Sequence, residues 1–145
     1  MDLEWLAEAL QLDEVFSEDL PLDNLLACLP SLSLQAWPAG EKVLKEGERG
    51  EELYVVYTGR LSVWRRGDFD ALKQIGLLEP GDFFGEIGFL MKSARSATVR
   101  TELKSKIFRF PAAEFAELLK KHRKLASMVR QAAGKRLQKL FLDET

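Results

Sequence analysis

The chain has 145 residues, of which 46% are hydrophobic and 30% are charged, and its formal net charge at pH 7 is −2. This length and composition predict one globular domain around a single core. The small negative charge argues against broad nucleic-acid binding, and the lack of a long apolar run argues against a membrane segment. The acidic N-terminus lacks the basic start of a secretory signal, so we expect a cytoplasmic protein. The lone Cys28 excludes an internal disulfide.

Residues 1–30 are expected to form a helical cap on the domain. Leucines recur at spacings of three and four residues, which predicts helices over residues 2–10 and 13–29. Pro21 suits the first turn of the second helix, and Pro30 ends it.

The apolar period changes to two at Ser31, so residues 31–110 are expected to form the β part of the domain. Short runs of alternating or β-branched residues, separated by glycine and proline turns, predict a sandwich or a double-sheet jelly roll. A barrel of this size can hold one small ligand. The predicted strands cover residues 31–36, 42–45, 53–57, 61–65, 72–78, 97–101 and 105–110.

Residues 111–145 are expected to form a helical lid. A helix begins near Pro111 and places Phe115, Leu118 and Leu119 on one face. A longer helix then runs to about Leu142 with a broad apolar stripe. This stripe can cover the chain's own β domain or pair with a second copy, and the sequence leaves both options open.

The segment over residues 84–99, FGEIGFLMKSARSATV, combines residue types that suit a sugar phosphate. Glycines at positions 85 and 88 allow backbone N–H groups to approach a ligand, and a short helix starting near Glu86 would direct its N-terminus at an anion. Arg95 can bind phosphate oxygens through two N–H groups, and Ser96 adds a hydroxyl and an N–H. Glu86 suits sugar hydroxyls. The alternative for a short glycine pattern alone is a solvated surface turn.

The full string resembles the phosphate-binding cassette of the cyclic nucleotide-binding domain family. The family pattern is F-G-E, an aliphatic and a small residue, several apolar positions, and then R-[AST]-A-[ST]-V. Residues 47–59, GERGEELYVVYTG, resemble a second signature of the same family in the expected order. The positions that fit the cassette are Phe84, Gly85, Glu86, Ile87, Gly88, Arg95, Ser96, Ala97, Thr98 and Val99.

The resemblance implies a mainly β fold with flanking helices: an eight-stranded double-sheet jelly roll with N-terminal helices and C-terminal helices B and C. It also implies a site without metal or cofactor for a 3′,5′-cyclic nucleotide. Glu86 would accept from the ribose 2′-hydroxyl, and Arg95 would hold the phosphate. Backbone N–H groups of Gly88 and Ser96 would assist, and Glu51 would hold Arg95 in place. The remaining implied contacts are Gly85, Ala97, Val63 and Ile87 at the site and Leu137, Leu140 and Phe141 in the lid.

Three cassette positions depart from the pattern of kinase regulatory subunits. Gly88 replaces Ala, Ala94 replaces Pro, and Ser96 replaces Ala. The Gly88 and Ser96 choices look more like bacterial catabolite-activator-type sensors. A hydroxyl after the arginine also occurs in domains that respond to cGMP. We therefore expect cAMP in preference to cGMP, with the choice of base left open by Ser96.

The leading hypothesis is a non-enzymatic cyclic nucleotide sensor that signals through its C-terminal helix to a protein partner or a second copy. One alternative is a degenerate domain that keeps the fold for protein contact, and another is the effector domain of a truncated transcription regulator or channel. An enzyme is disfavoured because the single histidine, His122, lies outside the predicted strands and metal or nucleophilic catalysis needs clustered side chains.

Overall fold

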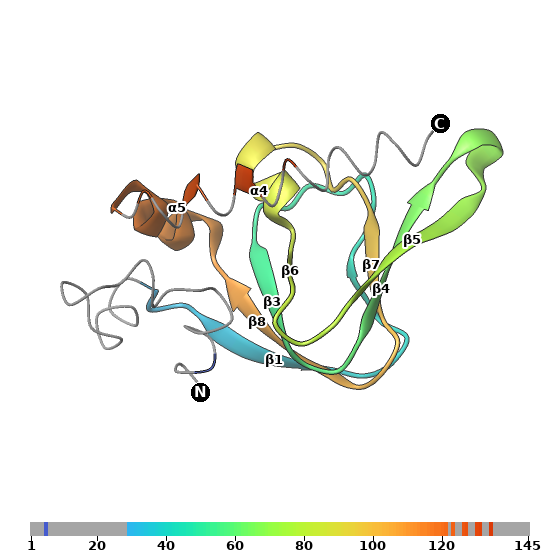
Figure 1. Ribbon diagram of the computed structural model, residues 1–145, viewed down its shortest axis with the longest axis horizontal. Helices are drawn as coiled ribbons and strands as arrows, with labels where there is room; N and C mark the ends of the chain where they lie inside the picture. The colour runs from blue at the N-terminus through green and yellow to red at the C-terminus, as the bar shows by residue number, and fades with distance from the viewer. Residues whose placement is uncertain are drawn as a thin grey trace.

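The computed structural model describes residues 29–121, together with residues 5, 123, 126, 127, 130, 131 and 134. Most of the predicted N-terminal helices and of the long C-terminal helix, including Leu137, Leu140 and Phe141, therefore lies outside the described residues. Trp5, which is helical, is described. The described part has eight strands in two layers, with helices at one side and one end (Figure 1).

The strands form two antiparallel sheets of four. In order across the first sheet, the strands are β1 (Ser33–Trp37), β8 (Ser105–Phe110), β3 (Leu53–Thr58) and β6 (Phe83–Phe84). In the second sheet they are β2 (Lys42–Leu44), β7 (Thr98–Thr101), β4 (Leu61–Arg66) and β5 (Leu72–Leu78).

The mainly β double-sheet prediction is confirmed, with two separate sheets in place of a closed barrel. All seven strands predicted from the alternation pattern are present within one or two residues of their expected bounds. The alternation pattern missed β6, because two phenylalanines are too few to show a period. This strand is held by pairing of Phe84 with Tyr54 and of Phe83 with Val55.

Buried side chains form two clusters on opposite faces of the first sheet. In β3, Tyr54 and Val56 face the core between the two sheets, whereas Leu53 and Val55 face an outer core. Both faces of β3 are therefore covered, and its sequence shows a continuous apolar run in place of an alternation. The outer core is closed by α5 (Ala112–Lys121), whose Phe115 and Leu118 are fully buried. Leu119 packs against the same cluster, so the three residues predicted to share one helix face all lie on the core side.

Trp5 also packs on the outer face of the first sheet. Its ring centroid lies 4.8 Å from that of Tyr57 and 6.0 Å from that of Phe108. Aromatic pairs at these separations are favourable beyond the area that they bury. Trp5 is thereby held against the strands at this point.

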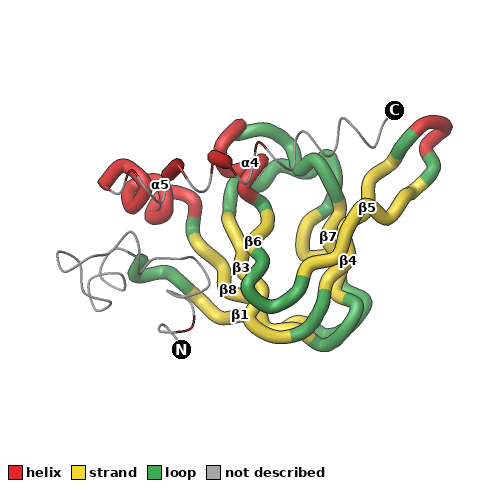
Figure 2. Tube along the Cα trace, in the orientation of Figure 1, coloured by secondary structure: helices red, strands yellow, loops and turns green. Residues whose placement is uncertain are grey.

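The β4–β5 hairpin extends beyond the two sheets and carries a short 3-10 helix, η1 (Asp68–Asp70), at its tip (Figure 2). Phe69 at this tip is fully exposed.

Between β6 and β7 the chain forms α4 (Glu86–Met91), so the short helix predicted after Gly85 is confirmed. Within the described part of the chain, no helix has the length and apolar character needed to cross a membrane.

Candidate functional site

A cavity of about 310 Å³ opens between the second sheet and the segment that contains α4. All eight residues predicted to contact a ligand line this cavity, although they come from β4, α4 and the approach to β7. They are Val63, Gly85, Glu86, Ile87, Gly88, Arg95, Ser96 and Ala97. The structure thus brings together residues up to 34 positions apart (97 − 63).

The cavity has a polar part and a larger apolar part. Charged side chains come from Glu86, Arg95 and Asp82, and Ser96 adds a hydroxyl. The rest of the lining is largely aliphatic or aromatic and includes several residues that the sequence patterns did not indicate. These residues are Leu44, Ile75, Gly76, Leu77 and Leu78, whereas Phe84 and Val99 belong to the predicted cassette.

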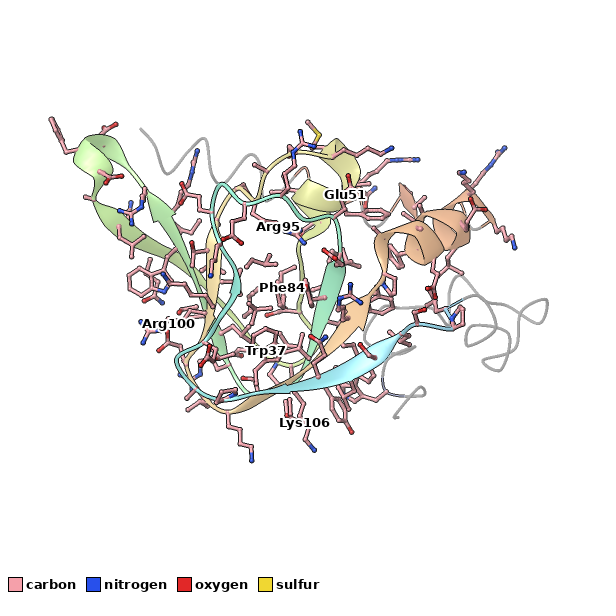
Figure 3. All side chains as sticks on the ribbon, turned by 180° about the vertical axis from the view of Figure 1, so that it is seen from behind. Trp37, Glu51, Phe84, Arg95, Arg100 and Lys106 are labelled. Carbon is pink, nitrogen blue, oxygen red and sulfur yellow. The ribbon has the colours of Figure 1, made fainter. Side chains whose placement is uncertain are left out.

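Arg95 is buried, and its side chain is only 4% exposed. Its Nη1 donates to the carbonyl oxygen of Gly85 at 3.1 Å, and its Nη2 donates to the carbonyl oxygen of Glu52 at 3.0 Å. Burial lowers the pKa of Arg95, and nearby Tyr54, Glu52 and Glu86 oppose this shift. The guanidinium stays charged at neutral pH, because arginine has a very high ordinary pKa. Figure 3 shows Arg95 in the space between the two sheets, above Phe84 in this view.

The carboxylate that pairs with Arg95 belongs to Glu52, so the prediction for Glu51 was wrong. The Glu52 Oε2 lies 3.4 Å from the Arg95 Nη2, whereas Glu51 is exposed and acts on Arg95 only through its charge. Strand parity explains the difference. Glu52 precedes Leu53, so it shares a face with Tyr54 and points toward the inner core, where Arg95 lies.

Glu52 also pairs with a second arginine. Its Oε1 lies 3.1 Å from the Nη2 of Arg109 on β8. Partial burial acts to raise the pKa of Glu52, but a hydrogen bond from its own backbone N–H and the interactions with Arg109 and Arg95 leave this pKa lowered. Glu52 is therefore ionised at neutral pH.

Two glycines leave the space that the Arg95 side chain occupies. A Cβ atom at Gly88 would lie 2.8 Å from the Arg95 Nη1 and 2.7 Å from the carbonyl oxygen of Gly50. A Cβ atom at Gly50 would lie 2.8 Å from the Arg95 Nε. Real Cβ atoms almost never approach so closely, so both positions need glycine while Arg95 keeps this conformation.

Backbone pairing joins the two sequence signatures. The N–H of Gly47 donates to the carbonyl of Arg95 at 2.9 Å, and the N–H of Arg95 donates to the carbonyl of Glu48 at 2.8 Å. Arg49 and Ala94 form an isolated antiparallel bridge at the same point. The first signature therefore supports the cassette directly, which is why residues far apart in sequence act on one arginine.

Glu86 lies in the first turn of α4 and is 1% exposed. The helix follows Gly85, which adopts a left-handed conformation with φ of 88°. The N–H of Phe89 donates to the carbonyl of Gly85 at 3.1 Å, so the amides of residues 86–88 precede the first helical hydrogen bond. The site thus combines a buried carboxylate, a buried guanidinium and helix-start amides.

The described residues contain no group of three or more histidine, cysteine or carboxylate side chains placed to hold a metal ion. The predicted lid residues Leu137, Leu140 and Phe141 lie outside the described part, so their contribution to the cavity stays a prediction.

Comparison with known proteins agrees with this geometry. The family model of the cyclic nucleotide-binding domain matches residues 34–122. The chain is 29% identical over 112 residues to the cAMP-dependent protein kinase regulatory subunit of Neurospora crassa, an alignment that covers 73% of this chain and 28% of that protein. The chain therefore spans little more than a quarter of that relative.

Two solved structures share the fold. The regulatory subunit of a cAMP-independent protein kinase A from Trypanosoma cruzi, bound to guanosine, gives a TM-score of 0.76 at 22% identity and covers 92% of this chain and 45% of that chain. The sensor domain of the transcriptional regulator DNR from Pseudomonas aeruginosa gives a TM-score of 0.73 at 23% identity, with 99% and 95% covered. The family match extends over more than half of the sequence. This chain belongs to the cyclic nucleotide-binding domain family.

Proposed function

We propose that this chain is a non-enzymatic sensor that binds a 3′,5′-cyclic nucleotide in the cavity beside α4. The observation that carries the proposal is the joint placement of buried Arg95 and buried Glu86 on one cavity of about 310 Å³. A buried guanidinium suits the phosphate, because a charge-assisted contact is strong in a site that excludes water. A buried carboxylate suits a ribose hydroxyl, because it accepts hydrogen bonds from hydroxyl groups and its negative charge repels the phosphate.

The remaining site residues have assigned roles in this proposal. The backbone N–H groups of Gly88 and Ser96 supplement Arg95 at the phosphate. Val63 and Ile87 contact the sugar and base, and Gly85 and Ala97 allow close approach of the ligand. The apolar wall formed by β4 and β5 receives the flat face of the base.

We expect cAMP in preference to cGMP. The β4 and β5 part of the lining presents Val63, Ile75 and Leu77, whose side chains offer no hydrogen bond to a base. Guanine would leave more polar groups unpaired on such a wall than adenine, and unpaired buried polar groups are unfavourable. The hydroxyl of Ser96 is the described lining group best suited to accept a hydrogen bond from a guanine amino group, which would oppose this preference.

In the proposed mechanism, the ligand binds more tightly to the state in which the C-terminal helix covers the base. The population of that state then rises with ligand concentration, and a protein partner or a second copy recognises the change. The predicted contacts Leu137, Leu140 and Phe141 belong to this lid. The position of α5 in the chain supports this mechanism, because α5 directly follows β8 and so connects the first sheet with the C-terminal segment.

The test is calorimetric titration of purified, nucleotide-free protein with cAMP, cGMP and the nucleosides adenosine and guanosine. Saturable binding of a cyclic nucleotide, tighter than of its nucleoside, would support the proposal, and the cAMP to cGMP ratio would fix the base preference. The nucleoside arm matters because the related Trypanosoma cruzi subunit was solved with guanosine.

The opposite result would be a folded, empty protein that binds neither cyclic nucleotide. This result would overturn the sensor proposal and favour the degenerate domain, in which the C-terminal helix serves protein contact alone.

A further inference from the structure

One carboxylate, that of Glu52, is shared between two arginines. Its Oε2 lies 3.4 Å from the Arg95 Nη2, and its Oε1 lies 3.1 Å from the Arg109 Nη2. The longer contact therefore goes to the arginine that lines the cavity, and the shorter goes to the arginine on β8. Tyr54 lies directly opposite Arg109 in the strand pairing.

The two arginines differ in their surroundings. Arg95 donates to two backbone carbonyls and has a side chain only 4% exposed, so its position is fixed by the fold. The side chains of Glu52 and Arg109 are each 32% exposed. If Glu52 leaves Arg95, its carboxylate can therefore be hydrogen-bonded by water and by Arg109 at a small cost in free energy. Arg95, in contrast, has little access to water.

A phosphate in the cavity needs the same guanidinium. Among the described residues, Glu52 is the one carboxylate within ion-pair distance of Arg95. Two anions on one buried cation repel each other, so the phosphate gains most when Glu52 turns away. Arg109 is in place to receive it through a contact that is already formed.

We propose that Glu52 competes with the phosphate of a bound cyclic nucleotide for Arg95, and that Arg109 sets the affinity by holding Glu52 away. This inference rests on the proposed function and adds two affinity-determining residues that do not line the cavity. The neighbouring Glu51 is assigned no part in it.

The experiment measures the Kd for cAMP, or for cGMP if that ligand binds more tightly, by calorimetry in four proteins. We expect Glu52→Gln to tighten binding by about fivefold and Arg109→Met to weaken it by a similar factor, the size that partly exposed ion pairs reach. Competition makes the double variant resemble Glu52→Gln, because Arg109 has no carboxylate left to hold. A general charge effect would instead make the double variant resemble the wild-type protein.

Glu51→Gln is the matched control, since it makes the same charge change one position earlier on an exposed side chain. We expect its Kd to stay within about twofold of the wild-type value. Thermal unfolding of each variant verifies the fold, and Arg109→Gln, which also removes the positive charge, replaces Arg109→Met if the latter does not fold.

Weaker or unchanged binding in Glu52→Gln, or an additive double variant, would overturn the competition while leaving the sensor proposal intact. A wild-type protein that binds no cyclic nucleotide would overturn both proposals.

Discussion

At the residue scale, the site depends on how one arginine is kept charged in a buried place. Arg95 is satisfied by two backbone carbonyls and a carboxylate before any ligand arrives. A buried charge that lacks partners would be strongly unfavourable, so these contacts are part of what allows the residue to be there. In the proposed complex, the ligand would meet a guanidinium that is already oriented, which would limit the entropy lost on binding.

Arg95→Ala should weaken binding of the preferred cyclic nucleotide at least about a hundredfold, because loss of a buried, hydrogen-bonded charge contact costs on the order of 3 kcal/mol. Calorimetry of the purified variant measures the change. Arg49→Ala is the control, because Arg49 is exposed in the segment that pairs with the cassette. Equal affinity of the Arg95 variant and the wild-type protein would remove the phosphate role from this residue.

Gly88→Ala should destabilise the fold by about 1–3 kcal/mol through overpacking, since the added Cβ would meet the Gly50 carbonyl at 2.7 Å. It should also weaken ligand binding by displacing Arg95. Chemical denaturation and calorimetry measure the two effects.

Gly134→Ala provides the matched helical control for Gly88→Ala. A Cβ there meets nothing within 4 Å, so this variant should gain up to about 1 kcal/mol from helix propensity. If Gly88→Ala proved as harmless as Gly134→Ala, the close packing around Arg95 would be refuted.

At the element scale, most of the fold could be predicted from the sequence, because its strands and helices show clear apolar periods and are separated by glycine and proline turns. Alternation and Gly/Pro turns indicated seven strands, and Pro111 with Phe115 and Leu118 indicated α5. The two-residue β6 has no period of its own and exists through pairing with β3.

The residues of the candidate site could be predicted from the sequence where they belong to a local sequence motif. The eight residues predicted to contact a ligand line one cavity, and their contact with a ligand stays a prediction. The ion-pair partner of Arg95 was predicted wrongly because two glutamates follow Gly50 in the sequence. Only the direction of the side chains along β3 shows that Glu52, and not Glu51, points toward Arg95. Ile75 and Leu77 were missed because their role depends on how β5 packs against α4, a tertiary arrangement that a single strand pattern does not contain.

The α5 element should contribute strongly to stability through its buried face. Phe115→Ala removes a fully buried ring that packs against Phe89 and Phe110, and it should lower the free energy of unfolding by about 3–5 kcal/mol. Urea denaturation measures this loss. Phe69→Ala makes the same substitution at a fully exposed ring and should change stability little, so similar losses in both variants would contradict the described packing.

At the scale of the whole molecule, the site joins parts that are distant in sequence. Glu52 precedes β3 and connects Arg95 of the cassette with Arg109 of β8, and the segment before β3 pairs with the cassette backbone. The second sheet supplies the apolar wall of the same cavity. Changes in the charge of Glu52 should therefore affect the stability of the entire domain.

The direction of that effect follows from the lowered pKa of Glu52. A carboxyl group whose pKa is lower in the folded state stabilises the fold above its unfolded pKa, which for glutamate is about 4.3. This stabilisation is lost as the pH falls below that value through the folded pKa.

The ligand-free wild-type protein should therefore lose stability from pH 5 to pH 3 more steeply than Glu52→Gln, which has no carboxyl group to titrate there. Urea denaturation across this pH range measures both slopes. Glu51→Gln is the control for the loss of one negative charge at an exposed neighbouring side chain. Equal slopes for Glu52→Gln and the wild-type protein would mean that the shared carboxylate does not stabilise the fold.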